Sequence, residues 1–172
     1  MEAASHLYLI ALGSNQPHRT LGPPAAILRH AVDALELPDI DVFSVSSTIR
    51  SRPIGPSRRE YANAAALILS PLLPPELLTR LQMIERHFGR NDVGQKWQRR
   101  PLDLDIILWD GGLWADADVC VPHPLFRNRD FVLGPAAQIA PEMRDPITHL
   151  TIKQLRFRFL HGKRVDPGSK RA

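Results

Sequence analysis

Short apolar runs alternate along this chain of 172 residues with stretches in which apolar side chains recur at helical spacing. Five apolar runs have the length of single strands and end at turn-forming residues, which predicts a sheet. They lie at 7–12, 42–49, 61–69, 102–109 and 119–121, the last as a short edge strand. The third run is rich in Ala, which also favours helix, but its short length and the following Pro71 favour a strand.

Two helices are predicted between these strands. Apolar side chains at 27–35 recur at helical spacing, and Pro38 closes that segment. A second apolar stripe runs through 77–88. Because Gln82 and Glu85 lie off this stripe, the pattern alone predicts that both face solvent.

The C-terminal part of the chain predicts two more helices. Residues 132–139 have helical character interrupted near Pro135. Thr151, followed by Gln154, forms a capping box that starts the last helix. Strands and helices are therefore interleaved without strict alternation, which favours an α+β sandwich with an antiparallel sheet over a doubly wound fold.

The strand at 102–109 carries two carboxylates. Alternate side chains of a strand share a face, so Asp103 and Asp105 lie together, with Cα atoms roughly 6.6 Å apart at about 3.3 Å per residue. Two unpaired carboxylates on a half-buried strand would repel each other, and a bound divalent cation would relieve that repulsion. Arg99 and Arg100 supply positive charge for an anion, a combination typical of phosphoryl transfer with Mg²⁺. The opposite face of the strand is predicted to carry Leu102, Leu104, Ile106 and Leu108.

The same residues have a plainer interpretation. An Asp-x-Asp pair beside arginines can be a solvated face with surface ion pairs. Here, however, each acidic residue lies between apolar residues, in a run more hydrophobic than an ordinary exposed edge. That context favours a functional site.

Composition limits the classes of protein to consider. An apolar fraction of 44% allows one domain with a normal core, which we assign to residues 1–160, followed by a basic, flexible tail at 161–172. Neither a secretory signal nor a membrane span is expected, because no basic region leads into an apolar core and no apolar run is long enough. The lone Cys120 excludes an intramolecular disulfide and favours the cytoplasm. Its apolar neighbours predict that it is buried.

The formal net charge of +4 does not by itself indicate nucleic acid. Part of the positive charge lies in the tail and part clusters at 90–100, beside the candidate chemistry. A nucleotide triphosphate explains the second cluster as well as DNA or RNA does.

Three connecting segments are candidates for function. Gly13-Ser14-Asn15 is either a functional turn or merely the end of the first strand. The polar, glycine-containing segment 89–97 is predicted to be a mobile lid. His123 lies between two prolines in an extended stretch, which favours a functional role over a place in the core.

Several motifs occur together in a fixed order: Gly13-Ser14-Asn15, 50–56 with Tyr61-Ala62-Asn63-Ala64, Glu85 with Gly89-Arg90, 100–108, 121–124 and 129–131. Between residue 7 and about residue 160, the chain therefore resembles the hydroxymethyl-dihydropterin pyrophosphokinase family, and its Arg-x-x-Asp-Leu-Asp block is highly specific. The resemblance implies a ferredoxin-like α-β-α sandwich. It also implies transfer of pyrophosphate from ATP to the hydroxymethyl group of 6-hydroxymethyl-7,8-dihydropterin, giving AMP and the pterin diphosphate, in folate biosynthesis.

The resemblance further implies which residues form the site. Asp103 and Asp105 match the ligands of two Mg²⁺ ions that bridge the ATP phosphates, and Arg90 and Arg100 match further catalytic positions. The pterin would lie between the rings of Tyr61 and Phe131, and the whole pterin-binding set is Ser51, Ile54, Tyr61, Asn63 and Phe131. The positions that match ATP-binding residues are Gln82, Glu85, Trp97, His123 and Arg129. The implied partners are ATP and a reduced pterin, with a monomer and no nucleic acid.

The chain departs from the family pattern in the lid. Asp92 and Lys96 stand at positions where the family usually carries arginine, and Gln98-Arg99 stands where Gly-Pro usually precedes the strand arginine. Asp92 would repel a triphosphate, and Lys cannot reproduce the bidentate phosphate contact of Arg. We therefore expect an active but slower enzyme.

Two other classes of protein remain as alternatives. A nucleotide- or RNA-binding module could keep the fold and lose the chemistry, although it would need neither both carboxylates nor a pterin-type pocket. A two-metal nuclease is the other alternative. The sequence shows no strong general base, and phosphoryl transfer does not require one if charge neutralisation and geometry lower the barrier.

Overall fold

The structure is a computed structural model, and it describes residues 4–51, 61–89 and 101–162. All pairings in its main sheet are antiparallel, in the order β2-β4-β1-β5, and β3 pairs with β4. The strands of this sheet are β1 (His6–Ser14), β2 (Asp41–Val45), β3 (Ile49–Ser51), β4 (Tyr61–Ser70) and β5 (Asp103–Trp109). In the described part of the chain, no helix is long and apolar enough to cross a membrane.

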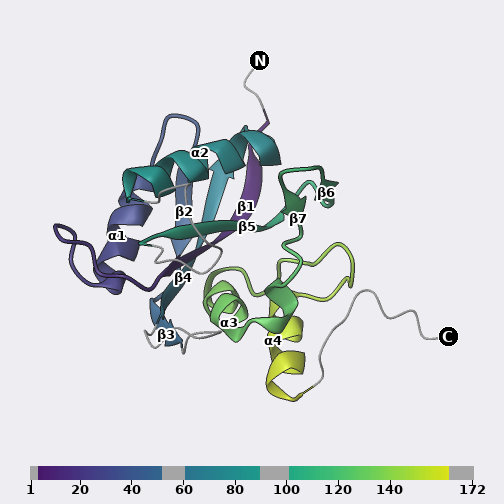
Figure 1. Cartoon of the computed structure of the whole chain (residues 1–172). Helices are drawn as coiled ribbons and strands as arrows, with labels where there is room; N and C mark the ends of the chain where they lie inside the picture. Colours follow the sequence, from purple (N-terminus) through teal and green to yellow (C-terminus); the bar gives the residue numbers. More distant parts are fainter. Residues whose placement is uncertain (1–3, 52–60, 90–100, 163–172) are drawn as a thin grey trace.

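Helices cover both faces of the sheet, so the predicted α+β sandwich is confirmed. Figure 1 shows α1 (Pro24–Leu35) and α2 (Pro74–His87) above the sheet, and α3 (Asp130–Ile139) and α4 (Ile152–Leu160) below it. Two interleaved crossovers, β1-α1-β2 and β4-α2-β5, give the ferredoxin-like topology. Each face of the sheet has its own apolar core, because alternate side chains of the central strands point to opposite faces.

The run at 42–49 forms two strands, so the prediction of one strand was wrong. Three polar residues, 46–48, separate β2 from β3. Ser46 Oγ accepts a hydrogen bond from the Ala65 N–H at 2.9 Å, and the Ser47 N–H donates to Gln138 Oε1 of α3 at 2.9 Å. These side-chain hydrogen bonds hold the segment in place where the two strands are interrupted.

The alternation within β5 also differs from the prediction. Leu9 of β1 faces Leu108, but the next residue, Ile10, faces Ile106, so Ile107 is an extra residue in a β-bulge. Leu108 therefore lies in the core beneath α3 and α4, whereas Leu104 and Ile106 lie in the core beneath α1 and α2. The prediction that Leu108 shares their face was wrong, since the bulge reverses the alternation.

The predicted start of α4 is confirmed, whereas the predicted interruption of α3 is not. Thr151 and Gln154 form the predicted capping box, in which the Gln154 N–H donates to Thr151 Oγ1 at 3.2 Å. The predicted interruption of α3 is absent, because the helix runs from Asp130 to Ile139 with Pro135 inside it. Burial of the helix against the sheet offsets the one hydrogen bond that Pro135 removes.

The predicted edge strand does not join the main sheet. β7 (Cys120–Val121) pairs with β6 (Trp114–Ala115) in a separate two-stranded sheet. Cys120 is exposed, so the prediction of a buried thiol was wrong, whereas its neighbour Val121 is buried. The alternation of a strand explains this difference between adjacent residues.

Candidate functional site

A row of residues crosses the sheet where β1 ends. Asp103 of β5 faces Gly13 of β1, Gly13 faces Asn63 of β4, and Asn63 faces Ile49 of β3. Two residues further along β5, Asp105 faces Ala11 of β1. Gly and Ala leave the sheet surface between these polar side chains open.

The predicted pairing of Asp103 and Asp105 on one face is confirmed. Leu102, Leu104 and Ile106 fill the core beneath α1 and α2, so the two carboxylates point to the face that carries α3. The side chain of Asp105 is 40% exposed, and Asp103 is half-buried. Both carboxylates are therefore exposed enough to contact a ligand on this face of the sheet.

His123 lies against this pair. The His123 N–H donates to the Ile107 carbonyl of β5 at 3.0 Å, and Nε2 lies 4.0 Å from Asp105 Oδ2. The Leu125 N–H donates to Nδ1 at 3.2 Å, so Nδ1 carries the lone pair and Nε2 carries the proton of the neutral ring. The imidazole thus presents an N–H donor towards the carboxylates.

Burial, and after it the Arg129 guanidinium, lower the pKa of His123 to about 4, although Asp103 and a backbone hydrogen bond act in the opposite direction. The ring is therefore neutral at pH 7. Its 4.0 Å contact with Asp105 is not an ion pair at that pH and is too long for a hydrogen bond.

The candidate pterin residues lie on the same face of the sheet. Tyr61 and Ser51 are register partners, and Asn63 Nδ2 donates to Ser51 Oγ at 2.8 Å. Phe131 occupies the first turn of α3, which packs on β3 and β4, and Arg129 Cζ lies 5.7 Å from the centre of its ring. Strand β4 and the segment that begins α3 therefore present two aromatic rings, a buried amide and a guanidinium on the face of the sheet that carries the carboxylates.

The two polar residues of α2 differ in burial. Gln82 is exposed, as the pattern predicts. Glu85 is only 2% exposed, so the prediction of a solvated side chain was wrong. Its Oε1 accepts a hydrogen bond from the Leu104 N–H at 2.8 Å, and this contact between α2 and β5 is invisible to a pattern within one helix.

Several predicted site residues lie outside the described residues. They are Ile54, Arg90, Trp97 and Arg100, together with the positions that depart from the family pattern, Asp92, Lys96, Gln98 and Arg99.

The structure shows that two polar residues at the end of β1, Ser14 and Asn15, are buried. Ser14 and Asn15 are 1% and 8% exposed, and within the described residues neither Ser14 Oγ nor Asn15 Oδ1 has a hydrogen-bond partner. The sequence identified their motif as a turn but gave no sign of this burial.

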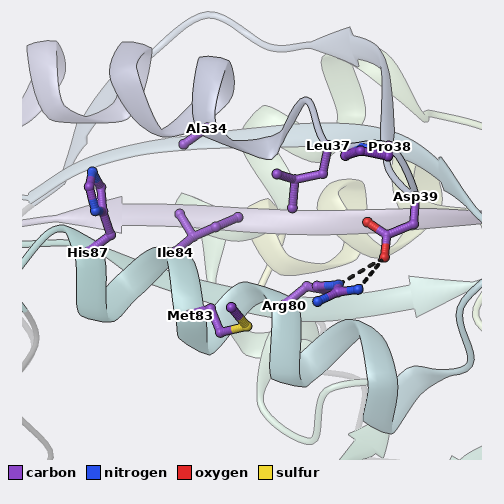
Figure 2. Close-up of a pocket in the computed structure, with 8 residues that line it drawn as sticks. All are labelled: Ala34, Leu37, Pro38, Asp39, Arg80, Met83, Ile84 and His87. Carbon is purple, nitrogen blue, oxygen red and sulfur yellow. Dashed lines mark hydrogen bonds and ion pairs between the residues drawn. The ribbon is translucent and has the colours of Figure 1, made fainter.

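A hollow of about 580 Å³ lies between α1 and α2, away from the carboxylates. Figure 2 shows Ile84 of α2 pointing towards α1, which carries Ala34, and an ion pair joins Arg80 to Asp39 at 2.8 Å. None of the residues that line the hollow is a candidate site residue.

The acidic pair fits a divalent cation that shares its ligands with a substrate. Among the described residues, no group of three or more His, Cys, Asp or Glu side chains could hold a metal ion alone. Mg²⁺ is commonly held by one or two carboxylates and completed by phosphate oxygens and water. Two adjacent carboxylates near a neutral N–H donor and a guanidinium suit that chemistry.

An acidic pair on a half-exposed face of a ferredoxin-like sandwich suits phosphoryl transfer. The profile of the 7,8-dihydro-6-hydroxymethylpterin-pyrophosphokinase (HPPK) family matches residues 9–141, and the chain belongs to this family. It is a pyrophosphokinase of folate biosynthesis, with ATP as co-substrate and a pterin as substrate.

Individual relatives agree with the family match. The chain is 40% identical over 151 residues to the 2-amino-4-hydroxy-6-hydroxymethyldihydropteridine pyrophosphokinase of Synechocystis sp., covering 87% of this chain and 74% of the relative. It is 37% identical over 136 residues to the enzyme of the same name from Haemophilus influenzae, covering 78% and 81%. The crystal structure of Plasmodium falciparum HPPK-DHPS has the same fold, with a TM-score of 0.70 at 10% identity over 94% of this chain and 46% of that chain.

Proposed function

We propose that Asp103 and Asp105 hold two Mg²⁺ ions against the ATP phosphates. The observation that carries this proposal is their shared, half-exposed face on β5. When bound, the ions would neutralise phosphate charge and orient the β-phosphorus. The sheet contributes by keeping the two carboxylates one strand repeat apart.

We propose that the pterin stacks between Tyr61 and Phe131, with its polar edge on Asn63. Offset stacking suits a flat heteroaromatic ring. The bond from Asn63 Nδ2 to Ser51 Oγ fixes the amide orientation and leaves Oδ1 and the second N–H to read the pterin. Ile54 completes this set in the proposal.

In the proposal, the ATP phosphates contact Arg129 and also His123, which lies near Asp103. His123 Nε2–H is a neutral donor for a phosphate oxygen, and Arg129 adds positive charge. In the proposal Gln82 contacts the nucleotide, and Arg90, Trp97 and Arg100 close over it. The buried position of Glu85 and its bond to the Leu104 N–H support a role in holding β5.

The transfer itself joins the pterin hydroxymethyl oxygen to the β-phosphorus and breaks the bond from that phosphorus to the oxygen of the α-phosphate. AMP leaves, and the hydroxyl proton passes to solvent. His123 is not the base in this proposal, because Nδ1 already accepts an N–H and Nε2 already carries the proton. Positioning and charge neutralisation carry the catalysis.

We further propose that residues 1–160 act as one domain, that 161–172 form a basic tail, and that the enzyme is a cytoplasmic monomer without a nucleic-acid partner. Two cores on one shared sheet support the single domain. The exposed thiol of Cys120 suits a reducing compartment.

The test of the proposed site is the nucleotide product. Purified protein is mixed with ATP, Mg²⁺ and hydroxymethyl-dihydropterin, beside the Asp105→Ala variant. AMP that depends on both the pterin and Asp105 supports the proposal. AMP formed equally by Asp105→Ala contradicts the metal role, and binding of ATP without any product supports the non-catalytic module.

A further inference from the structure

Glu85 holds the backbone of β5 between the two site carboxylates. Its side chain is 2% exposed, and Oε1 accepts the Leu104 N–H at 2.8 Å. Leu104 is the single residue between Asp103 and Asp105. The bond therefore acts on the peptide segment that joins the two proposed metal ligands.

The position of this bond explains why the strand needs it. Successive residues of a strand direct their N–H groups to opposite edges, and the described sheet ends at β5, with β1 on one side. The Leu104 N–H goes to α2 rather than to β1, so Glu85 stands where a further strand would otherwise pair. Without an acceptor, this N–H would be a buried, unsatisfied donor.

We propose that Glu85 is a positioning residue that sets the relative orientation of Asp103 and Asp105 and thereby the affinity of the site for divalent cations. The inference rests on the proposed role of the two aspartates as metal ligands. It assigns to Glu85 a hydrogen bond to the protein backbone as its function, instead of a contact with the nucleotide.

The chain offers a matched control on the same helix. Glu76 Oε2 accepts the Leu73 N–H at 2.8 Å at the start of α2, where the side chain is exposed. The two glutamates make the same kind of bond, but only Glu85 makes it beside the carboxylate pair. Glu85→Gln keeps an acceptor oxygen and removes the charge, whereas Glu85→Leu removes both.

The experiment measures binding of Mn²⁺ by electron paramagnetic resonance in the presence of α,β-methylene-ATP, using the full chain. Glu85→Leu is expected to weaken Mn²⁺ binding by about tenfold or more, the usual effect of losing a group that orients a metal ligand. Glu85→Gln and Glu76→Leu are expected to bind Mn²⁺ as the wild type does. The activity of Glu85→Leu should recover at high Mg²⁺, which a general loss of folding would not allow.

Glu85→Ala is the second variant, because water can reach the Leu104 N–H and the fold then tolerates the change better. It should also weaken Mn²⁺ binding. Wild-type Mn²⁺ affinity in a folded Glu85→Leu or Glu85→Ala overturns the inference. So does a Glu85→Gln variant that loses affinity for metal-free ATP, because that result makes Glu85 a nucleotide ligand.

Failure of the proposed function gives a different result. If wild-type protein with the ATP analogue binds no Mn²⁺, or if Asp105→Ala binds it equally well, the metal assignment itself is wrong.

Discussion

Two carboxylate sites of this protein have opposite surroundings. Asp145 and Arg127 are 0% and 2% exposed and form two bonds, from Arg127 Nε at 2.7 Å and from Nη2 at 2.6 Å. Asp105 is 40% exposed, and the imidazole 4.0 Å away is neutral at pH 7. Asp145 is buried among protein donors, whereas Asp105 is partly exposed and lies beside a second carboxylate.

The contrast distinguishes a buried carboxylate that supports the fold from a partly exposed carboxylate for which we propose a ligand-binding role. Burial raises the pKa of Asp145, but hydrogen bonds from Arg127, Thr148 and the Ile147 N–H outweigh it and leave the pKa below its usual range. Every one of these donors comes from the protein. Asp103 and Asp105 instead share a partly exposed sheet face, which suits the cation site proposed above.

The largest expected effect comes from breaking the buried pair. Arg127→Leu leaves Asp145 buried without its main partner and should lower the free energy of unfolding by about 3–5 kcal/mol. Urea denaturation measures this change. The double variant Arg127→Leu/Asp145→Leu should regain part of the loss, and an unchanged midpoint for the single variant would show that the pair is not structural.

The opposite pattern is expected at Asp103 and Asp105, which we call the open site. Asp105→Ala should lower turnover by roughly a hundredfold or more while the free energy of unfolding stays nearly constant. The measurement pairs steady-state AMP formation with urea denaturation of the same sample. A variant that loses stability and keeps its turnover would place Asp105 in the structural class beside Asp145.

Acid should unfold the protein partly through Asp145. Because its folded pKa is lowered, its contribution to stability is complete above the ordinary value of 3.8 and is lost as the pH falls through the folded pKa. Urea midpoints measured from pH 6 down to pH 2, with pH 6 chosen at about two units above that value, should fall less steeply for Arg127→Leu/Asp145→Leu than for the wild type. Equal slopes would mean that other carboxylates dominate acid unfolding.

The open site was the more predictable of the two regions. Asp103 and Asp105 are two residues apart in one strand, so local alternation places them together, and the capping box of α4 is equally local. Periodicity needs no knowledge of the rest of the fold. The family resemblance then linked the strand to residues on β4 and α3.

The features that were missed depend on contacts between distant segments. Arg127 and Asp145 are separated by 18 positions, and no pattern within either segment indicates their pairing. Glu85 is polar on a helix whose apolar stripe was correctly identified, yet packing against β5 buries it. The bulge at Ile107 likewise arises from the register of β1 against β5 and not from a breaker in the sequence.

The smallest expected effects come from removing two hydroxyl groups, one in each of the two regions. Thr148 Oγ1 donates to Asp145 Oδ2 at 2.5 Å, and Ser51 Oγ accepts from Asn63 Nδ2 at 2.8 Å. Thr148→Ala should lower the free energy of unfolding by about 1–2 kcal/mol and leave the KM for the pterin unchanged. Ser51→Ala should change stability little but raise that KM by about fivefold, since the Asn63 amide loses the bond that orients it.

The two variants therefore form a crossed test, in which each measurement serves as the control for the other variant. If Ser51→Ala lowers stability as much as Thr148→Ala does and leaves the KM unchanged, the bond between Ser51 and Asn63 only joins β3 to β4. The pterin-binding face would then be a structural feature of the sheet, and the division between the buried and the open region would be limited to Asp103 and Asp105. A rise in KM without a loss of stability would mean that the ligand-binding surface reaches across the sheet to β3. The Ser51 hydroxyl would then serve to orient Asn63 for the substrate, and not to stabilise the fold.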